Sequence, residues 1–265
     1  NSKVEPRFTD YAVITNDGRT FNGLMVSESS EVVVLRQAEN KEQVIPRSEI
    51  DELRSTSKSL MPEGVEKEVT IEQMAWDALR VLDKHQVERA NIVGHSMGTA
   101  IAQTLARLHP DRVNKMVLAA PFPHLNARGK LAVESWVMGL RENISQELFA
   151  RTLFPWLFTD QFLAQDGVFE LCLDGFKSHP YPLTAQGLQR QWEALEIFDS
   201  VSWLAQVTAP TLLLAGSQDI LTPPDQAETM QHLLPNAELK LLDAGHSALV
   251  ERAEEFNKAV ASFLG

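Results

Sequence analysis

The sequence predicts an α/β protein in which helices cover both faces of a parallel sheet, preceded by a small β-rich unit. Charged residues are denser at the start of the chain: residues 1–69 hold 22 of the 60 Asp, Glu, Lys and Arg residues, and all five tryptophans follow residue 70. The spacing of apolar residues also changes there, from alternation to helical spacing interrupted by short apolar runs. We therefore expect two units, residues 1–69 and 70–265.

The overall composition excludes several classes of protein. With 24 basic and 36 acidic residues the net charge is −12, which disfavours nucleic-acid binding. No apolar run approaches the roughly 18 residues of a membrane-spanning helix, so we expect no membrane span. Cys172 is the only cysteine, which excludes a disulfide framework and favours a cytoplasmic location. We expect no metal and no cofactor. The chain begins at Asn1 rather than Met, from which we expect a trimmed amino terminus.

The first unit alternates between apolar and polar residues, with turn residues between the runs. Asn16-Asp17-Gly18 is one such turn, because Asn, Asp and Gly tolerate the backbone angles that hairpins need. We expect short strands over 11–15, 20–26, 31–35, 44–46 and 50–53. Five short strands within about 45 residues indicate a small barrel; the alternative is an irregular β-rich arm.

Four segments of this unit, over roughly residues 8–66, resemble the small barrel of planctomycete-type haem-binding (cytochrome c-like) domains. They lie at 17–23, 32–36, 45–50 and 59–64. The Cys-x-x-Cys-His motif that attaches haem in that family is absent from this sequence, so the resemblance implies the barrel shape without haem. The barrel is also similar to Sm-like folds, but 13 acidic against 9 basic residues in 1–69 disfavour RNA binding.

The second unit begins with a helix signal. Thr70 and Gln73 have the spacing of a capping box, in which each side chain bonds the backbone near the other residue. Apolar residues then recur at helical spacing as far as Leu82. After this helix, short apolar runs alternate with helices, which is typical of a parallel sheet. The expected elements are strands over 90–94, 115–120, 211–215 and 239–242, and helices over 97–108 and 250–264.

Gly94-His95-Ser96-Met97-Gly98 lies between an expected strand and an expected helix. This is the setting of the Gly-x-Ser-x-Gly nucleophile elbow, a tight turn that lifts the serine hydroxyl above the sheet. Ser96 is then the candidate nucleophile, and the backbone N–H of Met97, at the start of the helix, is a candidate donor to an oxyanion. The alternative is a glycine-rich turn without chemistry.

A serine nucleophile needs a base, and the base needs an acid to orient it. His246 follows the last expected strand, and Asp219 follows the strand before it. The chain order Ser96, Asp219, His246 is the order of one known serine triad. Taken alone, His246 could equally be a packing histidine, and Asp219 a loop acid.

With these motifs, residues 70–265 resemble the α/β-hydrolase superfamily, in particular its small esterases and lactonases. The resemblance implies an α/β-hydrolase-type sheet with a helical cap over about 121–204. It also implies Ser96 as nucleophile, Asp219 as acid, His246 as base and Met97 as oxyanion donor. The implied reaction is hydrolysis of a small carboxylic ester through an acyl-enzyme. Among the expected partners are a small-molecule ester and a second copy of the chain.

The sequence departs from that family before residue 70. The family's His-Gly loop, which supplies a second oxyanion donor after an early strand, is absent, and the β-rich unit stands in its place. Strand 90–94 would then lack a neighbour unless residues 11–46 complete the sheet, and both arrangements remain open. The competing function is a catalytically impaired hydrolase-like protein whose barrel serves binding or assembly.

Overall fold

The computed structural model describes residues 9–36, 41–59 and 69–265. The chain divides into two compact units, Asn1–Glu68 and Val69–Gly265, which are considered separately. No helix in the described ranges has the length and apolar character needed to cross a membrane.

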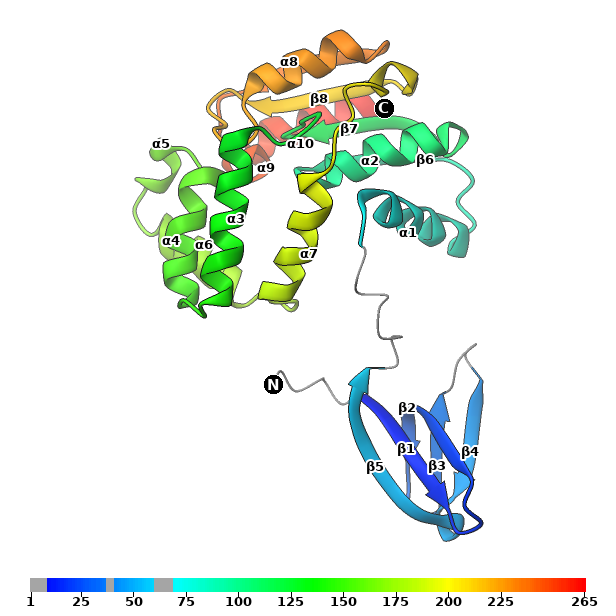
Figure 1. Cartoon of the computed structure of the whole chain (residues 1–265). Helices are drawn as coiled ribbons and strands as arrows, with labels where there is room; N and C mark the ends of the chain where they lie inside the picture. Colours follow the sequence, from blue (N-terminus) through cyan, green and yellow to red (C-terminus); the bar gives the residue numbers. More distant parts are fainter. Residues whose placement is uncertain (1–8, 37–40, 60–68) are drawn as a thin grey trace. The chain divides into compact units, whose positions relative to one another are not determined.

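The first unit is an antiparallel sheet in the order β4-β3-β2-β1-β5, coloured blue to cyan in Figure 1. Its strands are β1 (Thr9–Thr15), β2 (Thr20–Glu28), β3 (Val32–Arg36), β4 (Glu42–Pro46) and β5 (Ile50–Ser59). The alternating residues Val13, Val33, Leu35 and Ile45 form the buried core of this sheet. β5 extends six residues past the predicted strand end. Beyond Ser59, the segment 60–64 of the barrel-like pattern lies outside the described residues.

The two sheets do not share strands. β3 pairs with β2 and β4, whereas β6 (Ala90–His95) pairs with β7 (Val113–Ala119). Of the two arrangements that the sequence leaves open, residues 11–46 therefore form their own sheet. They do not complete the sheet of the second unit, since that sheet consists of β6, β7, β8 and β9.

The second unit contains a parallel sheet in the order β6-β7-β8-β9, as the alternation of apolar runs and helices predicts. β8 (Thr211–Gly216) is buried at every residue, and β9 (Ala237–Leu242) forms the far edge. The helices are α1 (Ile71–Lys84), α2 (Met97–Leu108), α3 (Ala127–Arg141), α4 (Gln146–Leu157), α5 (Asp160–Leu163), α6 (Val168–Lys177), α7 (Ala185–Glu196), α8 (Pro224–Leu233), α9 (Ala248–Glu251) and α10 (Ala253–Leu264).

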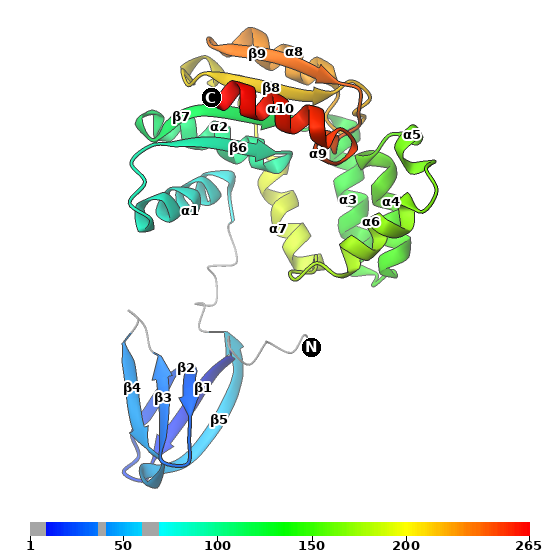
Figure 2. The same ribbon diagram turned by 180° about the vertical axis from the view of Figure 1, so that it is seen from behind.

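Helices cover the two faces of the sheet unequally. Apolar residues of α1, α2 and α8 pack on one face, and α9 and α10 pack on the other; Figure 2 shows α10 lying across that second face. The helix start at Thr70 is as predicted, since its side chain accepts a hydrogen bond from the Gln73 N–H at 3.0 Å. α10 does not reach the outer strand, so Val93 of β6 remains 51% exposed. In the described part of the chain, β6 has no neighbour on its outer edge.

Between β7 and β8 the chain forms the helices α3 to α7, which gather at one end of the sheet in Figures 1 and 2. Most aromatic residues of this cap pack on one another, with Phe154 in contact with Phe158, Phe169 and Phe176. These four phenylalanine rings hold the cap helices together.

The final helix predicted over 250–264 is present as α10, but it begins three residues later than predicted, because the chain breaks at Arg252 between α9 and α10. Arg252 has a non-helical backbone (φ −130°, ψ 47°), and its Nε donates to the carbonyl oxygen of Asp243 at 2.8 Å. This break turns the chain so that α9 stays beside the loop that carries His246.

Candidate active site

Ser96 occupies a sharp turn between β6 and α2. Its backbone lies in the left-handed region, with φ 52° and ψ −121°, which is rare for a residue with a side chain and indicates a strained position. Gly94 is required nearby, because a Cβ there would overlap the backbone of Gly98. The turn is thus the elbow that the sequence predicts, and Met97 begins α2 directly after it.

The three predicted side chains meet at the carboxyl ends of their strands. Nε2 of His246 lies 2.8 Å from Oγ of Ser96, and Nδ1 of His246 lies 2.8 Å from Oδ2 of Asp219. Both distances are those of good hydrogen bonds. The side chains of His246 and Asp219 are 2% and 0% exposed, so water does not compete for these contacts. With Nδ1 protonated toward Asp219, Nε2 is free to accept the proton of the Ser96 hydroxyl.

A set of donors fixes the Asp219 carboxylate. The backbone N–H groups of Leu221 and Thr222 donate to Oδ1 at 2.8 and 3.0 Å. The Thr222 hydroxyl donates to Oδ2 at 2.8 Å and lies 3.2 Å from Nδ1 of His246. Together these three donor groups hold the Asp219 carboxylate in a fixed orientation toward the imidazole.

Sequence reasoning missed the part played by Thr222, although the spacing contained a signal. An acid followed two and three residues later by free backbone N–H groups is the pattern of an Asx turn. His95 was also missed: its Nε2 lies 3.1 Å from the carbonyl oxygen of His246. Burial, and then repulsion by the neighbouring His246, lower the pKa of His95 below its ordinary value of 6.5.

A pocket of about 200 Å³ opens above Ser96. The cap contributes mostly apolar side chains to its wall, and Gln191 of α7 is the polar exception. The lining residues are His95, Ser96, Met97, Phe122, Leu125, Val133, Trp136, Leu157, Leu188, Gln191, Leu195, Leu221, Thr222, His246 and Ser247. The pocket therefore joins the serine and imidazole to a small, largely apolar space.

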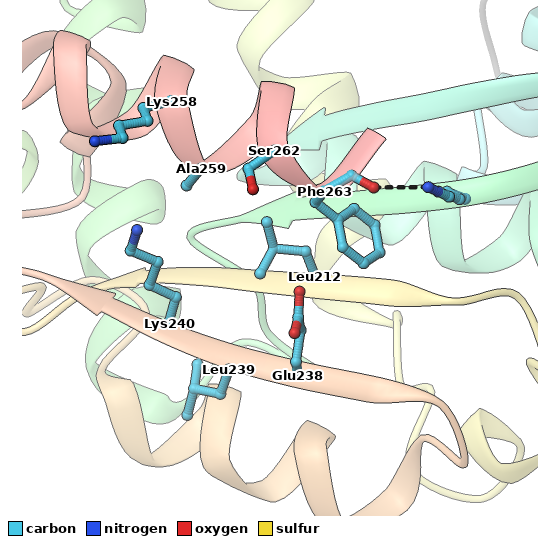
Figure 3. A pocket seen from close by; sticks show the side chains of 9 residues that line it. Leu212, Glu238, Leu239, Lys240, Lys258, Ala259, Ser262 and Phe263 are labelled. Carbon is cyan, nitrogen blue, oxygen red and sulfur yellow. Dashed lines mark hydrogen bonds between the residues drawn. The ribbon is translucent and has the colours of Figure 1, made fainter. Parts of the chain in front are cut away.

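A second hollow, of about 800 Å³, lies between α10 and β9 (Figure 3). Lys240 and Lys258 line one end of it, and the ammonium group of Lys115 donates to the carbonyl oxygen of Phe263 at 2.8 Å. Its lining residues do not include a nucleophile hydrogen-bonded to a base. We therefore take the pocket above Ser96 as the candidate active site.

Comparisons with known proteins agree with this fold. The α/β hydrolase fold family profile matches residues 54–253. The chain is 31% identical to "Putative carbamate hydrolase RutD" of Stutzerimonas stutzeri, over 79% of this chain and 78% of that protein. It is 30% identical to the poly(3-hydroxyalkanoate) depolymerase of Ectopseudomonas oleovorans, over 70% of this chain and 64% of that protein.

Solved structures give the same result. The enol-lactonase of Burkholderia xenovorans LB400 superposes with a TM-score of 0.66 at 26% identity, covering 74% of this chain and 73% of the lactonase. Three observations support the same assignment. They are the serine elbow at the end of a parallel strand, the cap inserted between later strands, and the family match over three quarters of the sequence. The chain belongs to the α/β-hydrolase family.

Proposed function

We propose that the protein is a serine hydrolase that cleaves small carboxylic esters through a covalent acyl-enzyme. The observation that carries this proposal is the continuous chain of hydrogen bonds from Ser96 through His246 to Asp219, with 2.8 Å at each step. Such a chain is the arrangement by which a neutral hydroxyl becomes a nucleophile near neutral pH.

In the first half of the proposed reaction, Ser96 Oγ attacks the ester carbonyl carbon while its proton passes to Nε2 of His246. Asp219 stabilises the imidazolium that forms, because its carboxylate already accepts from Nδ1. The carbonyl oxygen becomes an oxyanion, to which the Met97 N–H donates. The intermediate collapses when the carbon–oxygen bond to the leaving group breaks, and the alcohol departs with the proton from Nε2.

In the second half, water attacks the acyl carbon and gives a proton to Nε2 of His246. The bond between the acyl carbon and Ser96 Oγ then breaks, and Oγ takes the proton back. The products are a carboxylic acid and free enzyme. His246 therefore acts first as base and then as acid in each half.

The pocket supports a small, largely apolar acyl group. Its volume of about 200 Å³ is below the 300–1,000 Å³ typical of sites for drug-sized ligands. Trp136 and Leu188 of the cap are among the apolar residues that line it. We therefore propose short acyl esters as the preferred substrates.

Labelling with a fluorophosphonate probe tests the proposal without a chosen substrate. We expect the wild-type chain to label and to release p-nitrophenol from p-nitrophenyl acetate and butyrate. Ser96→Ala and His246→Ala should abolish both. Ser262→Ala, which alters an exposed serine on α10, is the matched control and should label fully. Turnover that persists in a folded Ser96→Ala variant would refute the assignment.

A second candidate substrate class is carbamates, favoured by the similarity to RutD. The same nucleophile would form a carbamoyl-enzyme in place of an acyl-enzyme. Comparison of p-nitrophenyl N-methylcarbamate with p-nitrophenyl acetate separates the two: a carbamoyl-enzyme that accumulates and hydrolyses slowly indicates an esterase, whereas steady turnover of the carbamate indicates a carbamate hydrolase.

The competing function, binding or assembly by an impaired hydrolase, is favoured by one observation. Among the described residues no strand lies beside the outer edge of β6, where the family's second oxyanion donor would come from, and loss of one such donor costs about 10² to 10³ in turnover. A folded wild-type chain that fails to label would favour this function.

A further inference from the structure

The backbone on each side of His246 is tied to a different part of the molecule. The N–H of Gly245, just before it, donates to Oε1 of Glu251 at 2.8 Å. The N–H of Ser247, just after it, donates to the carbonyl oxygen of Leu157 at 2.8 Å. Leu157 is the last residue of the cap helix α4 and also lines the pocket. The loop of the catalytic histidine thus touches the cap through its backbone.

The Glu251 carboxylate makes a second connection to the cap, through Thr159. The Thr159 hydroxyl donates to Oε2 at 2.5 Å, and the Thr159 N–H lies 3.3 Å from both carboxylate oxygens. Thr159 is 8% exposed and caps α5, since its hydroxyl also accepts from the Phe162 N–H at 3.2 Å. One carboxylate therefore holds the loop before His246 and the start of α5 together.

The fit around Gly245 is tight. A Cβ at this position would lie 3.0 Å from Oε1 of Glu251 and 3.1 Å from the carbonyl oxygen of Leu157. In the described ranges no Lys or Arg forms an ion pair with Glu251, so backbone and hydroxyl donors alone hold the charge. Such charge-assisted hydrogen bonds are shorter and stronger than neutral ones.

We propose that Glu251 is a positioning residue: its carboxylate couples the cap to His246, so that the placement of α4 and α5 sets the orientation of the catalytic imidazole. Glu251 touches neither the substrate nor the reacting atoms. Because Leu157 both lines the pocket and accepts from Ser247, an acyl group that fills the pocket presses on the same linkage. The role in turnover rests on the proposed function, whereas the effect on the imidazole does not.

Glu251→Gln, Thr159→Val and Thr159→Ser test this coupling. Glu251→Gln keeps the shape but replaces one of the two acceptor oxygens with an amide NH₂ group, which cannot accept from these donors. Thr159→Val removes the hydroxyl, and Thr159→Ser keeps it. The matched control is Glu254→Gln, an exposed acid on α10. We expect kcat for p-nitrophenyl butyrate to fall about tenfold in Glu251→Gln and Thr159→Val, with KM within twofold, and near wild-type kcat in Thr159→Ser and Glu254→Gln.

A measurement independent of turnover separates this inference from the proposed function. Proton NMR reports the low-field imidazole N–H signal of His246, assigned by its loss in His246→Ala. We expect this signal to shift and broaden in Glu251→Gln and Thr159→Val, and to be unchanged in Thr159→Ser and Glu254→Gln. An unchanged signal in folded Glu251→Gln and Thr159→Val would overturn the coupling, even if the wild-type chain proves to be inactive. A changed signal in an inactive chain would overturn only the proposed function.

Discussion

His95 and His246 lie side by side, with ring centroids 5.3 Å apart and planes inclined at 57°. Nε2 of His95 contacts the carbonyl oxygen of His246 at 3.1 Å. The residue before the proposed nucleophile Ser96 therefore supports the backbone of His246, the proposed base. Because the rings are close, repulsion by His246 contributes to lowering the pKa of His95.

This contact predicts how stability depends on pH. Burial, and then repulsion by His246, lower the pKa of His95 in the folded chain, partly opposed by the hydrogen bond to the His246 backbone and by the charge of Asp219. The unfolded chain therefore takes up this proton at a higher pH than the folded one. The contribution of His95 to the free energy of unfolding should be constant above about pH 6.5 and should fall as the pH drops below it.

Urea unfolding between pH 5 and 8 measures this dependence. His95→Gln keeps an N–H group near the His246 carbonyl but does not titrate, so it should flatten the profile below pH 6.5. A profile as steep as that of the wild-type chain would contradict the prediction.

Removal of the Thr222 hydroxyl should slow the reaction. This hydroxyl donates to Oδ2 of Asp219, the oxygen that also accepts from His246, and hydrogen bonds to charged groups contribute about 1.5–3 kcal/mol. We expect kcat to fall about tenfold in Thr222→Val, since 1.36 kcal/mol corresponds to a factor of ten. Thr222→Ser keeps the hydroxyl and should stay within twofold of the wild type.

Leu188 of α7 should limit acyl length. Its side chain is 8% exposed and lines the pocket above Ser96, so Leu188→Ala enlarges the space at that wall. The ratio of kcat/KM for p-nitrophenyl octanoate to that for the butyrate should rise at least fivefold. Leu171→Ala, which shortens a 73% exposed side chain of α6, should leave this ratio unchanged. An equal ratio in both variants would place the acyl group elsewhere.

Gly216 at the end of β8 should tolerate no larger residue. A Cβ there would overlap the carbonyl oxygens of Ala244 and Gly245, and backbone atoms cannot rotate away as side chains can. We expect Gly216→Ala to lower the free energy of unfolding by about 3 kcal/mol. Gly175→Ala in α6, where a Cβ has open space, should instead stabilise by about 0.5–1 kcal/mol.

The exposed edge of β6 predicts self-association. Ala90–His95 contains no Lys, Arg, Asp, Glu or Pro, the residues that usually protect an edge strand from pairing with another chain. Light scattering should detect dimers or larger species in the wild-type chain. Val93→Lys should shift the distribution toward monomer, whereas Val81→Lys on the exposed face of α1 should change it less.

The parallel sheet and its elbow were predictable because short apolar runs and glycines constrain the backbone locally. Gly94 shows this well, since the close approach to Gly98 permits no side chain. The break between α9 and α10 was not predictable, because it depends on Arg252 reaching the Asp243 carbonyl, a contact that apolar periodicity does not encode.

The candidate site was predictable in part for a related reason. Ser96, Asp219 and His246 each follow a parallel strand, and parallel strands bring their carboxyl ends to one edge of the sheet. Glu251 and Thr159 lie 92 residues apart in sequence, and no local pattern relates an acid in a late helix to a threonine of the cap. Their association depends on how the cap folds back on the sheet.

Gly216, at the end of β8, lies close to Ala244 and Gly245, which follow β9. The proposed catalysis therefore depends on the correct alignment of these two strands. Asp219 follows β8 by three residues and His246 follows β9 by four, so the proposed acid and base meet only in one pairing of these strands. A slip by one residue would displace them by about 3.3 Å, more than a hydrogen bond tolerates. The turnover rate of a refolded sample would then measure the fraction of molecules in which β8 and β9 are correctly paired. The helical content of the sample alone does not report this fraction.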